Sequence, residues 1–258
     1  MIGDGRASWH LSTVPISAIL DLLVRESRLS VVNLASDEYD AERRLAWGTP
    51  SPFELALSLR ANAYLSHGTA AYLHGLLQDI PTTFFVNKEQ GAKEQGGKLT
   101  QEALDRAFSS RPRQSRLAFS DEAGRRYVVV AGKFTNRLEV TETRGPAGEA
   151  LATTKLERTL IDIAVRPVYA GGVHKVLEAY RAARERASVN VLFATLKKLG
   201  YLYPYHQAIG LYLERAGYAP RDLALARRPG FHFDFYLTHG IQDRAYSSEW
   251  RLYYPRGL

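Results

Sequence analysis

The sequence contains no cysteine, and its other absences also narrow the possible chemistry. Without cysteine the chain cannot form a disulfide framework, a cysteine-ligated zinc or iron–sulfur site, or a cysteine nucleophile. It also has no Walker A sequence, no G-x-S-x-G elbow and no H-E-x-x-H pair. We therefore expect a protein that binds a partner, without a resident metal or cofactor and without enzymatic activity.

Long apolar runs are absent as well. The longest uncharged stretch, Ala61–Gln78, includes Asn62, Ser66 and two histidines, which is typical of a packed interior and not of a membrane span. The first ten residues lack the charged-then-apolar pattern of a signal peptide. We expect a soluble, cytoplasmic protein that has no membrane partner.

Acidic residues are in the minority, and their distribution is uneven. The 258 residues include 34 Lys and Arg against 27 Asp and Glu, a net charge of +7. Residues 1–64 carry six basic and eight acidic side chains, whereas residues 151–200 carry nine and four. A basic excess favours an anionic partner, nucleic acid first. The sequence places that contact in the second half of the chain.

Hydrophobic periodicity predicts an α+β fold. Helices are expected over residues 15–26, from 51 towards 61, and over 68–76, 100–108, 156–165, 171–186, 189–199 and 206–216. Strands are expected over residues 29–34, 82–87, 115–120, 125–131, 134–143, 231–237 and 249–254, and residues 36–44 are expected to be a charged connector. Two capping boxes are predicted, at Ser51–Glu54 and Thr154–Glu157.

Few side chains suggest chemistry, and each has a structural interpretation that is at least as good. His67 and His74 lie two helical turns apart but have no third metal ligand nearby. His232 and Asp234 share one face of a strand, as on any half-exposed strand. Asp162 stands four residues from both Arg158 and Arg166, which predicts a structural ion pair. Tyrosines 201, 203, 205, 212 and 218 suit either a core or nucleic-acid stacking.

Several separated motifs, in order, resemble one family over about residue 50 to the end. They are AYLSH (63–67) with YLHGL (72–76), IPTTFFV (80–86), LERTLID (156–162), RP (166–167), AGG (170–172), FDFYL (233–237) and WRLYYP (250–255). This pattern is similar to that of the AbiEi antitoxins, which are transcriptional regulators of type IV, or abortive infection, toxin–antitoxin systems. None of these motifs is a catalytic signature, and each also describes ordinary packing.

The resemblance implies an N-terminal winged helix that represses the operon, and a C-terminal domain that supports DNA binding and counters a nucleotidyltransferase toxin of the AbiEii type. Here residues 1–50 form a short, slightly acidic, winged-helix-like or degenerate segment, and residues 51–258 form a mixed α/β antitoxin domain with a helical cluster. Operator DNA is therefore expected to contact basic residues of the second half. They are Arg181, Arg184, Arg186, Lys197, Lys198, Arg227 and Arg228.

Two other functions stay open at this point. The acidic N-terminal segment also suits a protein-binding antitoxin that contacts its toxin directly and has lost DNA binding. An enzyme acting on nucleic acid or nucleotide would have Asp234, His232 and Asp162 as candidate catalytic groups. Lys197 and Lys198 lie at the end of a predicted helix, where complementing the helix dipole is an equally good interpretation.

Overall fold

The computed structural model describes residues 14–26, 29–92 and 98–258. Its helices are α1 Ile16–Arg25, α2 Pro52–Ser58, α3 His67–Leu73, α4 Gln101–Ser109, α5 Leu156–Val165, α6 Val173–Ala183, α7 Val189–Leu199, α8 Tyr205–Arg215 and α9 Pro220–Arg227, with a 3₁₀ turn at Pro167–Ala170. Its strands are β1 Leu29–Leu34, β2 Glu42–Trp47, β3 Tyr64–Leu65, β4 Thr83–Glu89, β5 Ala118–Ser120, β6 Arg126–Gly132, β7 Val140–Arg144, β8 Ala150–Thr154, β9 Phe235–Tyr236, β10 Arg244–Ser247 and β11 Leu252–Pro255. The α+β class is confirmed.

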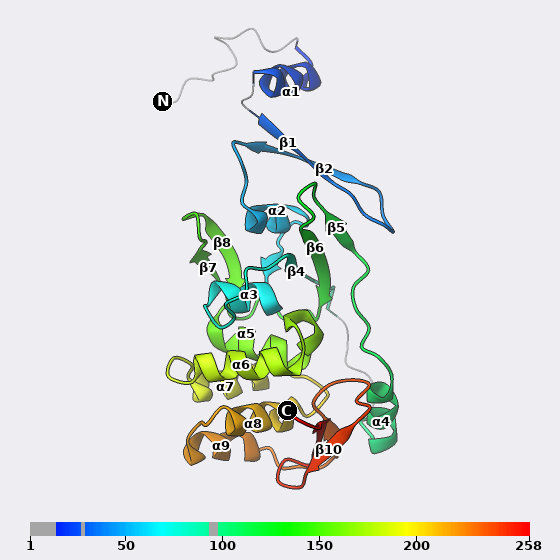
Figure 1. Cartoon of the computed structure of the whole chain (residues 1–258), viewed down its shortest axis with the longest axis vertical. Coiled ribbons are helices and arrows are strands. Elements are labelled where there is room, and N and C mark those ends of the chain that lie inside the picture. The colour runs from blue at the N-terminus through cyan, green and yellow to red at the C-terminus, as the bar shows by residue number, and fades with distance from the viewer. Residues whose placement is uncertain (1–13, 27–28, 93–97) are drawn as a thin grey trace.

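Most elements follow one another along the long axis of the molecule, but α4 lies beside the C-terminal strands (Figure 1). Helix α1 and the β1–β2 hairpin lie at one end, the main sheet lies in the middle, and helices α5 to α9 with the C-terminal strands lie at the other end. No helix within the described part of the chain is long and apolar enough to cross a bilayer.

The β1–β2 hairpin shortens the expected charged connector over residues 36–44: residues 36–41 form the connecting loop, and residues 42–44 belong to β2. Strand β2 pairs antiparallel with β1, from Leu29 opposite Trp47 to Leu34 opposite Glu42. Glu42 binds Arg44 on its own strand and Arg60 beyond it, the latter at 2.8 Å. Charged side chains that form ion pairs with one another are compatible with a strand, so the high charge of residues 42–44 did not indicate that they belong to β2. Leu34, in the last pair before the connecting loop, is fully buried.

The central sheet has six strands in the order β5-β6-β4-β3-β8-β7. It is mixed, because β4 pairs parallel with β6 and β3 parallel with β8, while the other pairs are antiparallel. Strand β6 shows how its two faces are used. Tyr127 and Val129 pack in the cluster beneath α2, whereas Val128 and Val130 pack with Tyr169 on the other face. This is the two-residue periodicity of a strand buried on both sides.

Local signals fix several helix ends as the sequence predicts. The capping box at the start of α2 is formed, since the Glu54 amide donates to Ser51 Oγ at 3.2 Å and the Ser51 amide to Glu54 Oε2 at 2.7 Å. Helix α7 has the predicted bounds and ends at Gly200, which adopts a left-handed conformation. The predicted box at Thr154 is wrong. Lys155 is the N-cap of α5, and the Thr154 hydroxyl instead contacts that of Thr159 at 2.8 Å.

The strand predicted over residues 134–143 begins only at Val140. The preceding residues form turns, with Asn136, Arg137 and Glu139 at positive φ. The physical reason is the Glu89 carboxylate, which accepts the backbone amides of Thr135 and Arg137. Amides bound to a carboxylate are not available to a neighbouring strand, so an alternating sequence does not become a strand here.

The C-terminal sheet, β10-β11-β9, is fastened to α4 across more than 130 residues of sequence. Gln101 at the start of α4 both donates to the Asp234 carbonyl and accepts the Asp234 amide, each at 2.9 Å. At the other end of α4, the Gly240 amide donates to the Phe108 carbonyl at 2.8 Å. The segment after β9 therefore lies against the last turn of α4.

Gly210 provides a test of the packing between α8 and the C-terminal strands. A Cβ added to Gly210 would overlap ring atoms of Trp250, which is fully buried. We expect Gly210→Ala to lower the free energy of unfolding by about 2 kcal/mol, because overpacking outweighs the better helix propensity of alanine. Urea denaturation measures this change. Gly91→Ala is the control, since a Cβ there meets nothing and stability should change by less than about 0.5 kcal/mol. An unchanged midpoint for Gly210→Ala would contradict the packing described.

Candidate functional site

The structure distributes the seven predicted DNA-binding residues over the ends of three helices. Arg181 lies in the last turn of α6, and Arg184 and Arg186 follow it; Lys197 and Lys198 lie in the last turn of α7, and Arg227 and Arg228 at the end of α9. All except Arg227 are exposed. Arg227 binds Glu249 and lies over the Trp250 ring at 4.8 Å, so it serves packing.

Three of the seven residues line two adjoining hollows along α7 and α9, and Arg228 lines both of them. Arg184 and Arg228 line a hollow of about 540 Å³ with Arg221, which the sequence reasoning missed. Lys197 and Arg228 line an adjoining hollow of about 640 Å³. We call Arg184, Lys197, Arg221 and Arg228 the α7–α9 basic face. Its acidic neighbours are Asp222, which lines the first hollow, and Glu185, which pairs with Arg184.

The lysines at the end of α7 are not needed to satisfy that helix terminus. Lys133 Nζ donates to the carbonyls of both Leu199 and Gly200, at 2.7 Å each. Burial in this position lowers the pKa of Lys133 below its ordinary value. Neither Lys197 nor Lys198 has an ion pair within 4 Å among the described residues. Their ammonium groups are therefore available to an external anion.

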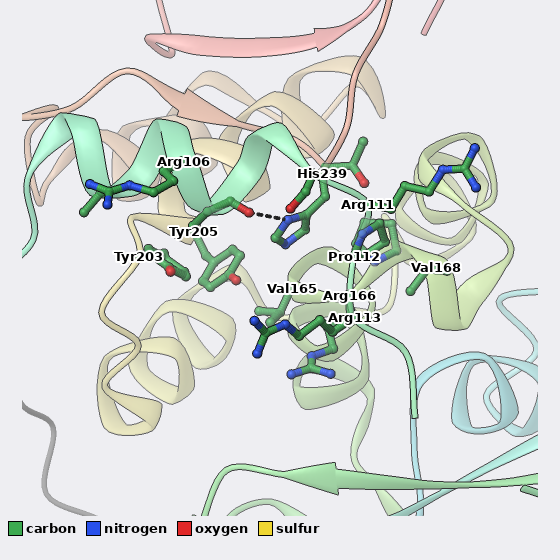
Figure 2. A pocket seen from close by; sticks show the side chains of 15 residues that line it. Arg106, Arg111, Pro112, Arg113, Val165, Arg166, Val168, Tyr203, Tyr205 and His239 are labelled. Atoms are coloured by element: carbon green, nitrogen blue, oxygen red, sulfur yellow. Dashed lines mark hydrogen bonds between the residues drawn. The ribbon is translucent and has the colours of Figure 1, made fainter. Parts of the chain in front are cut away.

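A second basic site lies between α4, α5 and the segment after β9 (Figure 2). A cavity of about 700 Å³ is lined by four arginines from three parts of the chain: Arg106 on α4, Arg111 and Arg113 just after it, and Arg166 at the end of α5. We call it the arginine-lined cavity. No acidic side chain is among its lining residues, and none of the four arginines has an ion pair in the described ranges. Figure 2 shows these side chains around the central His239 ring.

Long-range hydrogen bonds hold the walls of this cavity in place. His239 Nδ1 lies 3.0 Å from the Ala107 carbonyl oxygen, and its ring stacks on Phe108 with centroids 4.1 Å apart. The Ser115 amide donates to the Tyr169 hydroxyl at 2.8 Å, just beyond the arginines of the connecting segment. The residues between α4 and β5 are therefore anchored at both ends.

The hydrogen bond of His239 defines its chemistry. A carbonyl oxygen only accepts, so Nδ1 carries the proton and Nε2 is the remaining ring nitrogen. Burial lowers the pKa of His239, the Ala107 carbonyl opposes that shift, and the charge of Arg166 adds to it. The net direction is below the ordinary value of 6.5, so the ring is neutral near pH 7 and Nε2 is a hydrogen-bond acceptor.

The candidate catalytic residues His232 and Asp234 lie in the segment before β9, because the strand predicted over residues 231–237 is limited to Phe235–Tyr236, and Asp234 is held by structural contacts. Asp234 binds Arg251 Nε at 2.9 Å and accepts the Tyr246 hydroxyl at 2.8 Å. Arg251 lowers the pKa of the Asp234 carboxyl, so it is ionised and paired. His232 is exposed beside it. No group of three metal-ligating side chains occurs in residues 14–26, 29–92 and 98–258.

His67 and His74 each have a local protein partner. His67 Nδ1 lies 2.8 Å from the Ser66 hydroxyl, and His74 Nε2 lies 2.6 Å from the Thr154 carbonyl oxygen. Burial lowers the pKa of His67 to about 3, so this ring is neutral. Each imidazole therefore has the structural role that the sequence favours.

Asp162 forms the ion pair that the sequence predicts, and it does so inside the protein. Arg158 Nε lies 2.8 Å from Asp162 Oδ1, and the two side chains are 5% and 6% exposed. Arg158 Nη1 also donates to the Leu138 carbonyl at 2.9 Å. Burial raises the pKa of the Asp162 carboxyl, and the Arg158 guanidinium opposes that rise. Arg166, the other predicted partner, instead lies over the Tyr169 ring and faces the cavity.

Sequence reasoning missed the arginine-lined cavity although one signal was available. Residues 106–116 contain four arginines and no acidic residue, the densest basic stretch of the chain. In the sequence, Arg166 stands out only as part of the RP motif and as a possible partner of Asp162. Nothing local in the sequence indicates that these segments meet, since the bonds that bring them together join residues far apart.

Comparison with known proteins adds a fold relationship. No protein-family model matches the chain, and no curated protein matches it either. Among solved structures, the crystal structure of the RV2827C protein from Mycobacterium tuberculosis aligns with a TM-score of 0.57 at 16% identity. The alignment covers 94% of this chain and 80% of that chain. At this identity the likeness concerns the fold alone.

The buried Arg158–Asp162 pair can be tested with a double-mutant cycle. We expect Arg158→Met and Asp162→Leu each to cost about 3–5 kcal/mol, because each leaves an unpaired buried charge. The double variant should lose much less than the sum of the two, since no charge remains buried. Denaturant unfolding of the four proteins measures the coupling. Lys155→Gln breaks the more exposed pair with Glu139 and should cost less than about 1 kcal/mol. Additive losses would contradict a coupled pair.

Proposed function

We propose that this chain is a non-enzymatic antitoxin and transcriptional autoregulator of the AbiEi type, which binds operator DNA through the α7–α9 basic face. The observation that carries the proposal is the meeting of Arg184, Lys197 and Arg228 at two adjoining hollows. Lys197 and Arg228 have no ion pair among the described residues, and Arg184 pairs only with its exposed neighbour Glu185. Such basic side chains suit phosphate contacts, which dominate DNA affinity. The ordered motifs from about residue 50 to the end support the family assignment.

The N-terminal elements support assigning the phosphate contacts to the second half. A recognition helix presents basic and polar side chains to the major groove. In α1 the charged side chains are Asp21 and Arg25, and the remaining residues are apolar or serine. The hairpin that follows α1 matches the wing expected after such a helix, but it carries Glu42 paired with Arg44. This unit contributes little positive charge.

A second candidate function, a protein-binding antitoxin without DNA binding, is favoured by a different observation. Helix α1 has no buried residue, and it exposes Ile16 at 76% and Leu22 at 52%. Trp47 on β2 is 71% exposed. Exposed tryptophan is a frequent anchor of protein interfaces. Under this candidate, the same unit contacts the nucleotidyltransferase toxin directly.

The DNA proposal is tested by neutralising the end of α7. We expect Lys197→Gln/Lys198→Gln to weaken binding to the promoter duplex of its own gene. It should also flatten the slope of log Kd against log salt, by about 0.9 for each lost phosphate contact. Fluorescence anisotropy across a salt series measures both quantities. Lys175→Gln is the control, because that ammonium is already paired with Asp79 and Glu178. Unchanged affinity and slope in the double variant would refute DNA contact at this helix end.

The protein-binding candidate is tested by co-purification with the product of the adjacent gene. We expect Trp47→Ser to abolish capture of a nucleotidyltransferase-like partner while leaving promoter binding intact, since Trp47 is not on the basic face. Circular dichroism checks that the variant is folded. Capture by the wild type with no promoter binding would favour this candidate over the first. Equal capture by wild type and variant would exclude Trp47 as an anchor.

A further inference from the structure

We propose that the arginine-lined cavity binds a nucleotide-sized ligand that carries a di- or triphosphate group. The site is separate from the α7–α9 basic face, because Arg106, Arg111, Arg113 and Arg166 do not belong to that face. The two sites have one element in common: Tyr203 and Tyr205 line both this cavity and the hollow beside Lys197.

The charge of the cavity is the first support. Four arginines line one hollow, and its lining contains no carboxylate. Like charges gathered in a concave site repel one another, and a multiply charged anion removes that repulsion. Guanidinium is the group best suited to phosphate, since its planar fork donates two parallel hydrogen bonds to one phosphate group. Several arginines around one site therefore fit several adjacent phosphates.

The size and the walls of the cavity are the second support. A volume of about 700 Å³ falls within the range of small-molecule sites and greatly exceeds the space that one inorganic phosphate fills. Part of the wall is apolar, formed by Pro112, Val165, Pro167 and Val168. A flat organic group can lie against these side chains while its phosphates reach the arginines. The cavity thus has two chemically different regions, as an amphipathic ligand requires.

His239 adds a polar group of defined direction. Its Nδ1 is committed to the Ala107 carbonyl, and stacking on Phe108 fixes the ring plane. Figure 2 shows the ring between Tyr205 and Pro112, with Val165 and Arg166 below it in this view. The neutral ring offers Nε2 as an acceptor, which suits a hydroxyl or amino group of the ligand and not another phosphate oxygen. Because a nucleotide has such hydrogen-bond donors and pyrophosphate does not, the Nε2 acceptor favours a nucleotide as the ligand.

Titration calorimetry at fixed moderate salt tests the proposal, with ATP, GTP, CTP, pyrophosphate, inorganic phosphate and a DNA duplex as probes. We expect at least one nucleoside triphosphate to bind more tightly than pyrophosphate. We expect Arg113→Gln/Arg166→Gln to weaken that binding at least tenfold, because it removes charge-assisted bonds contributed by two separate segments of the chain. Arg126→Gln, which changes another exposed arginine, should leave it unchanged.

Three outcomes would overturn the proposal. The first is that no triphosphate binds, or that the double variant binds as tightly as the wild type. The second is that pyrophosphate or phosphate binds as tightly as every triphosphate, which makes the cavity a simple anion site. The third is that only the duplex binds and the double variant loses it, which assigns these arginines to DNA contact. If the wild type does not bind its promoter, only the DNA-binding proposal is refuted, and the calorimetric test of nucleotide binding remains valid.

Discussion

The arrangement of the molecule depends on one buried ion pair. Arg158 and Asp162 lie one turn apart on α5, both nearly excluded from solvent, and the Leu138 carbonyl takes a further guanidinium hydrogen. Removing two charges from water is costly, and only complete pairing with good geometry compensates for it. That geometry requires α5 and the turn before β7 to be in their native positions together. The pair therefore couples the sheet half of the molecule to the helical half.

Helix α5 transmits this constraint to the candidate sites. Its buried face, including Leu160, Ile161 and Ile163, belongs to the large core formed with α6, α7 and α8. At its end, Arg166 leaves the helical backbone conformation, and Pro167 starts the 3₁₀ turn that follows. The direction in which the Arg166 side chain leaves the helix is thus set by the same element that holds the ion pair. The position of Arg166 in the arginine-lined cavity therefore depends on the buried Arg158–Asp162 pair earlier in the same helix.

Local features were predictable from the sequence, and features made by distant contacts were not. The spacing of Arg158 and Asp162, the Ser51 capping box and the Gly200 terminus are short-range, and the structure has all three. The start of strand β2 was not predicted, because its charged side chains form ion pairs that the sequence does not reveal. The arginine-lined cavity was not predicted, because the hydrogen bonds that form it join His239 to Ala107, 132 residues apart, and Ser115 to Tyr169, 54 residues apart. The positions of the basic residues were visible in the sequence, but their grouping was not.

The segment Tyr203–Tyr205 forms a common wall of the two basic hollows. An occupant that shifts this wall from one side alters the shape of the other hollow. Thermodynamic linkage then makes the effect mutual: a ligand that changes the affinity for DNA by some factor has its own affinity changed by DNA by that same factor. If a nucleotide and DNA bind at the two hollows as proposed, the wall formed by Tyr203 and Tyr205 couples the two binding events without any movement of whole domains.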